Sequence, residues 1–214
     1  MPARKSPPPR PYHHGNLRES LVEAAEELLE QHGVQGVTLR EVARVAGVSH
    51  AAPYHHFAGL DALLAAVAER SFTQLGASIA KAAQAGEPRD ALLRICEAYV
   101  AHACAHPAQF RLMFGPMLAR KSEFPEFAGA ARAAFTQVLE VAEALAPGEG
   151  AALALSGWSL AHGFAHLAID RAMEDLPVPV SPDPATARRL AEWLLRRDAP
   201  APGGKRQRRQ RQAP

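Results

Sequence analysis

Residues 38 to 57 constrain the fold of this chain more than any other stretch. They read Thr-Leu-Arg-Glu-Val-Ala-Arg-Val-Ala-Gly-Val-Ser-His-Ala-Ala-Pro-Tyr-His-His-Phe. The first half has an apolar face at helical spacing and stops at Gly47, where a left-handed residue costs least. Ser49 then offers an N-cap for a second helix. Two short helices joined by a tight turn are typical of a helix-turn-helix, whose second helix enters the DNA major groove.

A longer stretch around this motif, from about Gly15 to Leu64, resembles the TetR/AcrR family of one-component transcriptional regulators. The residues that carry the resemblance are Gly47-Val48-Ser49, Tyr54, His56-Phe57 and Leu63-Leu64. It implies an all-α protein with an N-terminal three-helix helix-turn-helix domain and a C-terminal helical bundle. It also implies a transcriptional regulator that binds DNA through the N-terminal domain and is regulated through the C-terminal bundle.

The composition agrees with a helical protein. Alanine and leucine are abundant, aromatic residues make up 6% and runs of β-branched residues are absent. No apolar run reaches the ~20 residues that a membrane span needs, and the first five residues lead into prolines rather than an apolar signal segment. We therefore expect a soluble, cytoplasmic protein. Motifs of nucleophilic hydrolases, phosphate loops and zinc proteases are missing from the sequence, so we expect no enzyme.

Proline, glycine and apolar spacing predict about nine helices. Their approximate ranges are 16–32, 38–45, 49–56, 60–84, 88–106, 107–113, 123–146, 149–173 and 185–197. We divide the chain into four parts. These are a basic disordered arm (1–14), the DNA-binding domain (15–62), a ligand-binding and dimerisation domain (63–198) and a basic disordered tail (199–214).

The resemblance places nine residues at the DNA: Thr38, Arg40, Ser49, His50, Ala51, Ala52, Tyr54, His55 and His56. Among them, Arg40 takes the position of a guanine reader, and a bidentate Arg-guanine contact gives roughly 1–3 kcal/mol of discrimination. Ala51 and Ala52 offer methyl contacts that suit thymine. Thr38, Tyr54, His55 and His56 match positions that bind phosphates, although packing inside the three-helix unit explains Tyr54 and His56 as well.

The charge distribution is unfavourable for DNA binding, which depends on the neutralisation of phosphates by cationic side chains. The net charge is +2, yet the two ends are basic and residues 15–202 carry −6. Family members usually have a lysine where this chain has Leu60, which removes one more phosphate contact. We therefore hypothesise that the basic arms, 1–10 and 203–211, contact phosphates. A solvated tail that aids solubility is the alternative.

The second half carries another resemblance, to a TetR subgroup with a Trp-x-x-x-His-Gly signature. The matching residues are Gly157 to Gly163, His106-Pro107 and Phe110 to Gly115. The resemblance implies homodimerisation through the last two predicted helices and an effector cavity among the four helices between 88 and 173. Candidate cavity walls are apolar, aromatic or sulfur-containing: Tyr99, Phe110, Met113, Phe114, Met117, Phe124, Phe135, Trp158 and His162. An ordinary bundle core is the alternative for each of them.

The helix at 149–173 also has a stripe of small residues, Ala154, Gly157, Ala161, Ala165 and Ala168. Such a stripe lets two helices approach closely, and we expect it at the dimer seam.

A cluster of His102, Cys104 and His106 suggests a metal sensor as a minor alternative, because the two histidines stand at a chelating i, i+4 step. Cys104 lies on another side of the helix, and His106 belongs to the His-Pro motif. We therefore expect no metal and no cofactor. Cys96 and Cys104 are too far apart along one helix for a disulfide.

The sequence thus predicts a ligand-responsive homodimeric regulator, most simply a repressor released from a palindromic operator by a small-molecule effector. A helix-turn-helix module that binds a partner or shapes DNA without an effector is the alternative. A filled bundle core favours that alternative, and an apolar cavity reaching Trp158 favours the regulator.

The role of the basic arms has a direct test. If the arms bind phosphates, trimming them should flatten the slope of log affinity against log salt by ~0.9 for each phosphate that is no longer bound. Operator binding by full-length and trimmed protein, measured from low to high salt, gives both slopes. Equal slopes would exclude a contribution from the arms.

Overall fold

The structure, a computed structural model, describes residues 17–84, 86–118 and 121–197, and these residues form helices and their connections. In chain order the elements are α1 (Leu17–His32), η1 (Val34–Gly36), α2 (Leu39–Val45), η2 (Ala52–His55), α3 (Leu60–Ala83), α4 (Pro88–Ala105), α5 (Pro107–Phe114), η3 (Pro116–Leu118), η4 (Lys121–Glu123), α6 (Pro125–Leu145), α7 (Gly150–Ile169) and α8 (Pro184–Arg197), where η marks a 3-10 helix. The predicted basic segments 1–14 and 199–214, and Asn16, lie outside the described residues.

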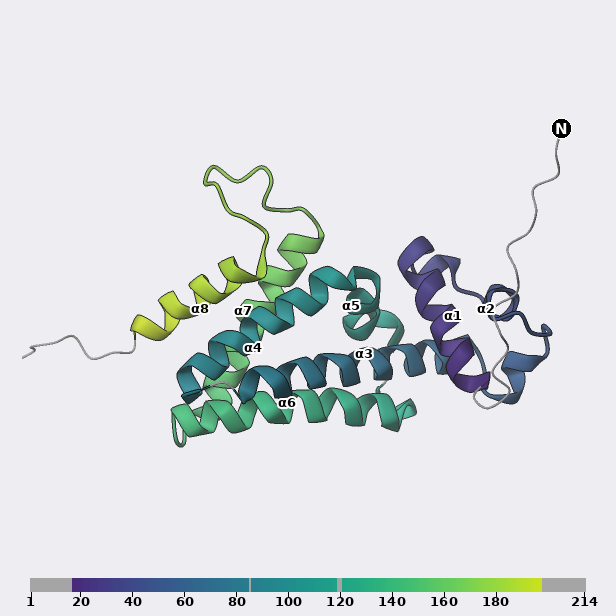
Figure 1. Cartoon of the computed structure of the whole chain (residues 1–214), viewed down its shortest axis with the longest axis horizontal. Coiled ribbons are helices and arrows are strands. Elements are labelled where there is room, and N and C mark those ends of the chain that lie inside the picture. Colours follow the sequence, from purple (N-terminus) through teal and green to yellow (C-terminus); the bar gives the residue numbers. More distant parts are fainter. Residues whose placement is uncertain (1–16, 85, 119–120, 198–214) are drawn as a thin grey trace, which may run out of the picture.

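The molecule is elongated, with a small head at one end and a larger bundle at the other (Figure 1). The head contains α1, α2 and η2. Helix α3 runs from the head into the bundle and packs against α1 as well as against α4, α5 and α6. Helices α7 and α8 close the bundle against α4. The predicted all-α fold, with a helix-turn-helix head and a C-terminal bundle, is confirmed.

Proline sets the start of four helices in the bundle. Pro88, Pro107, Pro125 and Pro184 each occupy the first residue of α4, α5, α6 and α8. Proline is favoured there because its ring fixes a helical φ, and its missing N–H would have no partner in the first turn. The predicted boundaries at these prolines agree with the structure within two residues.

The predicted helix at 49–56 is wrong in its type. The structure has a turn followed by the 3-10 helix η2. Pro53 has no N–H to give the Ser49 carbonyl, which accepts a hydrogen bond from Ala52 N at 3.0 Å instead. Tyr54 N then bonds the Ala51 carbonyl at 3.2 Å. The i→i+3 pattern therefore continues through the segment, and the described residues hold eight α-helices rather than about nine.

Helix α7 ends at Ile169, before the predicted limit at residue 173. Arg171 has a φ of +57°, and Ala172 N bonds the Leu167 carbonyl at 3.0 Å across this left-handed residue. This is the Schellman closure that usually employs glycine. An arginine in that position gives no stop signal in the sequence, which explains the overestimated length.

One apolar core extends through head and bundle along α3. Leu63, Leu64 and Val67 are fully buried in the head half of the helix, and Leu75 and Ile79 are 2% exposed in the bundle half. These residues belong to a single contiguous cluster. Each such side chain contributes about 1.5–3 kcal/mol through burial. The shared core makes α3 the structural link between the two parts.

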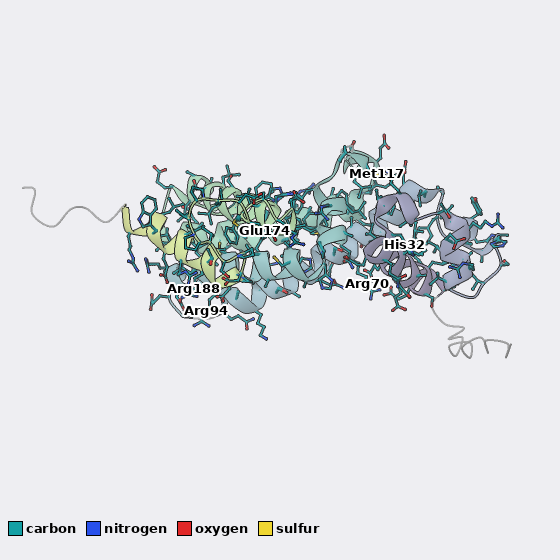
Figure 2. The ribbon with its side chains drawn as sticks, turned by 90° about the horizontal axis from the view of Figure 1, so that it is seen from above. His32, Arg70, Arg94, Met117, Glu174 and Arg188 are labelled. Atoms are coloured by element: carbon teal, nitrogen blue, oxygen red, sulfur yellow. The ribbon has the colours of Figure 1, made fainter. Side chains whose placement is uncertain are left out.

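Polar contacts hold neighbouring helices in register. Arg70 on α3 forms ion pairs with Glu19, Glu23 and Glu26 on α1. Near the far end of the bundle, Arg188 on α8 bonds Asp90 on α4 at 2.6 Å. Figure 2 shows Arg70 beside the head, and Arg94 and Arg188 close together at the opposite end. The bundle and head are therefore each fixed by charges at their edges.

Candidate DNA-binding surface and effector pocket

The start of α2 is held by Thr38. Its hydroxyl oxygen accepts a hydrogen bond from Glu41 N at 3.2 Å, so Thr38 is the N-cap of this helix. The side chain is exposed, and its hydroxyl hydrogen is still available for a phosphate oxygen. Arg40 is exposed two residues later. The predicted DNA contacts on α2 therefore face solvent at one edge of the head.

The turn after α2 depends on Gly47. Its φ is +72°, and Val48 N reaches back to the Ala43 carbonyl at 2.9 Å. A side chain at this position would be strained, because L-residues other than glycine rarely adopt a positive φ. This turn brings η2 alongside α2.

Most of the predicted DNA contacts after the turn are exposed. Tyr54 is 64% exposed, and His56 is also exposed, so neither packs inside the three-helix unit. Ala52 is half-buried, while Pro53 and Phe57 hold η2 to the head core. The remaining exposed members of the predicted set are Ser49, His50, Ala51 and His55.

Four arginines lie in the head or beside it, and two of them form ion pairs with carboxylates. Arg44 bonds Glu41 at 2.7 Å, which holds the pKa of the Glu41 carboxyl below its usual range. Arg70 is engaged by the α1 glutamates described above. Arg18 lies over the Phe57 ring, 5.3 Å from its centroid. Arg40 is thus the arginine best placed to reach DNA from the helix-turn-helix.

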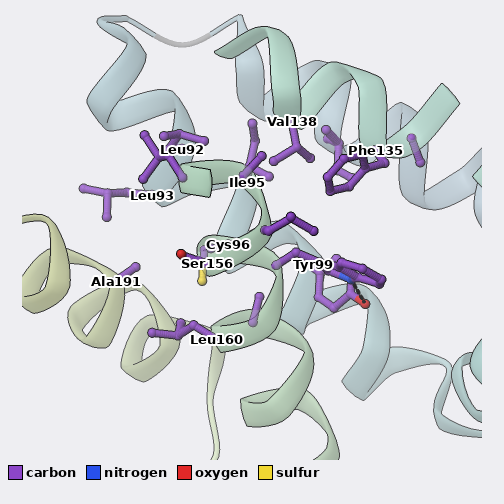
Figure 3. Close-up of a pocket in the computed structure, with 18 of the residues that line it drawn as sticks. Leu92, Leu93, Ile95, Cys96, Tyr99, Phe135, Val138, Ser156, Leu160 and Ala191 are labelled. Atoms are coloured by element: carbon purple, nitrogen blue, oxygen red, sulfur yellow. Dashed lines mark hydrogen bonds between the residues drawn. The ribbon is translucent and has the colours of Figure 1, made fainter. Parts of the chain in front are cut away.

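The bundle contains a pocket of about 270 Å³. Its walls come from α3 to α8, and Figure 3 shows Leu92 and Leu93 at one side, with Tyr99 and Phe135 at the other. Of the described residues that line it, none has a charged side chain. The pocket is therefore apolar over nearly all of its wall.

A hydrogen-bonded trio forms the polar part of the wall. Trp158 Nε1 donates to the Tyr99 hydroxyl oxygen at 3.1 Å, and the same oxygen lies 2.9 Å from His162 Nδ1. Burial, and then the neighbouring His166, lower the pKa of His162. Burial also raises the pKa of Tyr99 above its usual range. Both groups are therefore neutral near pH 7.

The predicted pocket residues fall into three groups. Tyr99, Phe114, Phe135 and Trp158 line the pocket, and His162 stands behind it through its bond to Tyr99. Phe110 and Met113 are buried in the core. Met117 is 43% exposed and Phe124 half-buried, and neither lines the pocket.

Sequence reasoning missed most of the aliphatic wall. Helix α3 contributes Phe72, Leu75 and Ile79, and α8 contributes Leu194 and Leu195. These residues have ordinary core spacing, so periodicity could not separate them from residues that fill the core.

The small-residue stripe of α7 is partly buried inside the protomer. Ala154, Ala161 and Ala165 are almost fully buried within the protomer. The larger Leu155 and Leu167 are 49% and 47% exposed on the other side of the helix. Three of the five stripe residues therefore pack against their own bundle, whereas Gly157 is exposed and Ala168 is half-buried, so the role of the stripe at a dimer seam stays a prediction.

The histidine cluster of α4 offers two neighbouring rings. The centroids of His102 and His106 are 5.3 Å apart. Burial, with His106 nearby, lowers the pKa of His102 to about 4. Within residues 17–84, 86–118 and 121–197, no three His, Cys, Asp or Glu side chains gather as a metal-ligand set. Cys96 is buried and Cys104 exposed, and both are free thiols.

The head touches the pocket wall through α5. Both carboxylate oxygens of Glu30, near the end of α1, accept backbone hydrogen bonds, from Ala108 N at 3.3 Å and Gln109 N at 3.2 Å. These amides belong to the first turn of α5 and have no partner within that helix. The last residue of α5, Phe114, lines the pocket. One short helix therefore joins a head carboxylate to the pocket.

Two family models match this chain. Residues 21–67 match "Bacterial regulatory proteins, tetR family", and residues 92–197 match "Tetracyclin repressor-like, C-terminal domain". The chain belongs to the TetR family of DNA-binding transcriptional regulators. Proteins of this family are soluble transcription factors rather than enzymes.

Individual relatives agree with this assignment. An uncharacterised helix-turn-helix-type transcriptional regulator of Mycobacterium tuberculosis is 29% identical, with 74% of this chain and 73% of the relative covered. A solved protein of unknown function from Rhodococcus sp. RHA1 is 34% identical, with a TM-score of 0.72 and coverage of 88% and 98%. A tetR-family regulatory protein from Rhodococcus RHA1, 24% identical with a TM-score of 0.61 and coverage of 85% and 96%, shares the fold.

The Glu30 contact predicts a measurable stability change. Glu30→Ala should lower the free energy of unfolding by about 1 kcal/mol, because it removes the acceptors of two first-turn amides. Glu30→Gln, which keeps one acceptor oxygen, should have a smaller effect. Chemical denaturation measures the free energy of unfolding of each variant and of the unaltered protein. Glu27→Ala is the matched control on the same helix, and an equal destabilisation of this variant would contradict the capping role.

Proposed function

We propose that this protein is a homodimeric repressor whose grip on a palindromic operator is released when a small molecule enters the bundle pocket. The observation that carries the proposal is the double role of α3. Its bundle half supplies Phe72, Leu75 and Ile79 to the pocket wall, and its head half supplies Leu63 and Leu64 to the core beneath the helix-turn-helix. A change in the pocket wall therefore acts on the same rigid element that supports the DNA-binding surface.

The contact between α1 and α5 supports this coupling. Phe114 at the end of α5 lies against His162, with ring centroids 4.6 Å apart, and against Phe72 at 5.4 Å. A ligand that displaces Phe114 moves α5, and the Glu30 cap transfers that movement to α1. The head then has two attachments to the pocket, through α3 and through α5.

The DNA end of the proposal depends on residues of α2, the turn and η2. Arg40 reads a guanine, Thr38 and Tyr54 bind phosphates, and His50 and Ala51 face the bases. Two such surfaces in a dimer must match half-sites about one helical turn, ~34–36 Å, or multiples of it apart. A shift of a few ångströms between the two heads breaks this match and releases the operator.

The exposed apolar faces of α7 and α8 support the homodimer. Leu155 and Leu167 on α7, and Leu190, Trp193 and Leu194 on α8, are between 42% and 56% exposed. Contrary to the expectation from the sequence, α7 is long and apolar enough to cross a membrane by length and composition alone, yet one such helix is weak evidence for a span. In a soluble regulator, a second copy of the chain covers this surface, and we assign the protein to the cytoplasm.

The alternative without an effector has less support. A module that binds a partner or shapes DNA needs no cavity, and its bundle would gain stability from a filled core. The pocket reaches Trp158, which favours the effector-controlled regulator.

Arg40→Ala should weaken operator binding by about 1–3 kcal/mol per half-site, because it removes the guanine contact. The operator is first mapped by protection of DNA flanking the protein's own gene, and the affinities follow from titration on that fragment. Arg94→Ala, at the far end of the bundle, is the matched control and should bind as the unaltered protein does. Equal affinity of the Arg40 variant would exclude its role, and a lack of any protected site would exclude the repressor.

The dimer face can be tested in solution. Leu155→Glu and Trp193→Glu should each convert the dimer into a monomer at micromolar concentration, because a charge buried in an apolar interface finds no partner. Light scattering coupled to gel filtration measures the mass. Met117→Glu, equally exposed but at η3, is the control and should remain dimeric. A dimer that persists in both interface variants would place the seam elsewhere.

A further inference from the structure

The described side chains that line the pocket are almost all apolar and none is charged, which restricts the kind of ligand that can bind. We infer that its ligand is an uncharged, elongated apolar molecule with one hydroxyl-type hydrogen-bonding group, for which a medium-chain alcohol is the simplest representative. The inference rests on the proposed effector role of this pocket and adds the chemical class of the effector.

The lack of charge follows from the lining residues. The described lining consists of aliphatic and aromatic side chains, with Cys96, Tyr99, Ser156 and the indole of Trp158 as its polar members. A carboxylate or ammonium group inside would lose its hydration without gaining an opposite charge. Asp90 on α4 and Arg188 on α8, which do not line the pocket, are already bonded to each other.

The single polar group follows from the geometry of Tyr99. The indole N–H of Trp158 can donate and cannot accept, so the Tyr99 oxygen accepts it. The bond to His162 Nδ1 uses a second position on that oxygen. One further position remains on that oxygen, and a ligand hydroxyl group that reaches it can act either as donor or as acceptor. Burial that keeps Tyr99 protonated also keeps this anchor neutral.

The elongated shape follows from the distribution of side chains. Leu92 and Leu93 lie on one side of the pocket in Figure 3, and Tyr99 lies on the opposite side with Phe135. An aliphatic chain directed toward the leucines can therefore keep its polar end at Tyr99. The volume of about 270 Å³ is near the lower end of ligand pockets, which suits a chain of moderate length.

Three probes with the same eight-carbon chain test the inference: 1-octanol, octanoate and octylammonium. Calorimetric titration of the full-length protein at pH 7 should show 1-octanol binding at least about tenfold more tightly than either ion, a difference of 1.4 kcal/mol. Equal or tighter binding of either ion would overturn the inference. Failure of 1-octanol to bind would overturn it as well.

Two variants connect this binding to the pocket. Tyr99→Phe should weaken 1-octanol binding about fivefold, the usual effect of removing one hydrogen bond, and leave n-octane binding unchanged. Failure to bind either ligand would instead indicate structural damage. Ala131→Leu narrows the pocket and should weaken both, whereas Ala133→Leu, exposed on the same helix, should weaken neither. Undiminished binding to the Ala131 variant would place the ligand elsewhere.

Operator titrations separate this inference from the proposed function. If 1-octanol binds as expected but leaves operator affinity unchanged, the ligand class stands and the effector role fails. If the protein binds its operator but none of the probes, the ligand class fails and the DNA-binding role stands.

Discussion

Burial of one long helix in two places is the constraint on which the rest of this structure depends. Helix α3 has 24 residues, about 36 Å at 1.5 Å per residue. The same helix packs into the head at one end and into the bundle at the other. Leu64 in the head and Ile79 in the bundle lie on the same helix and belong to one contiguous core. Close-packed interiors resist gradual deformation, so strain at one end is relieved by rotation of the whole element. In the proposed mechanism, α3 itself therefore connects the pocket to the DNA-binding head.

Much of the architecture could be predicted because the sequence marks its own boundaries. Prolines such as Pro107 and Pro125 open helices, Gly47 ends one, and apolar spacing identifies the face each helix buries. These signals act locally, within one turn, so a single sequence is enough to find them. Where a local signal was overridden, the prediction failed: Pro53 removed an amide that the α-helix needs, and Arg171 took a left-handed conformation normally left to glycine.

The functional surfaces were predictable to different degrees. The residues predicted to face DNA stand at fixed positions in a motif, and the exposure of Tyr54 and His56 is compatible with that prediction. The pocket is an unfilled space between helices. Leucines that line such a space have the same sequence spacing as leucines in a filled core, so the sequence does not distinguish them. Helix α7 is apolar on every side, so periodicity could not tell its inward face from its outward one. Glu30 was missed because its partners, the first amides of α5, are distant in sequence.

The short 3-10 form of η2 limits how much sequence information η2 itself can read, so base readout in the proposed complex depends mainly on Arg40, His50 and Ala51, which lie outside it. Four residues at about 2 Å per residue cover roughly 8 Å, which corresponds to two or three base steps. Two of these residues, Ala52 and Pro53, are buried or half-buried, so few side chains remain for base edges. In the proposed dimer, selectivity also depends on the spacing and symmetry of the two half-sites, which makes the relative placement of the two heads as important as the chemistry of either.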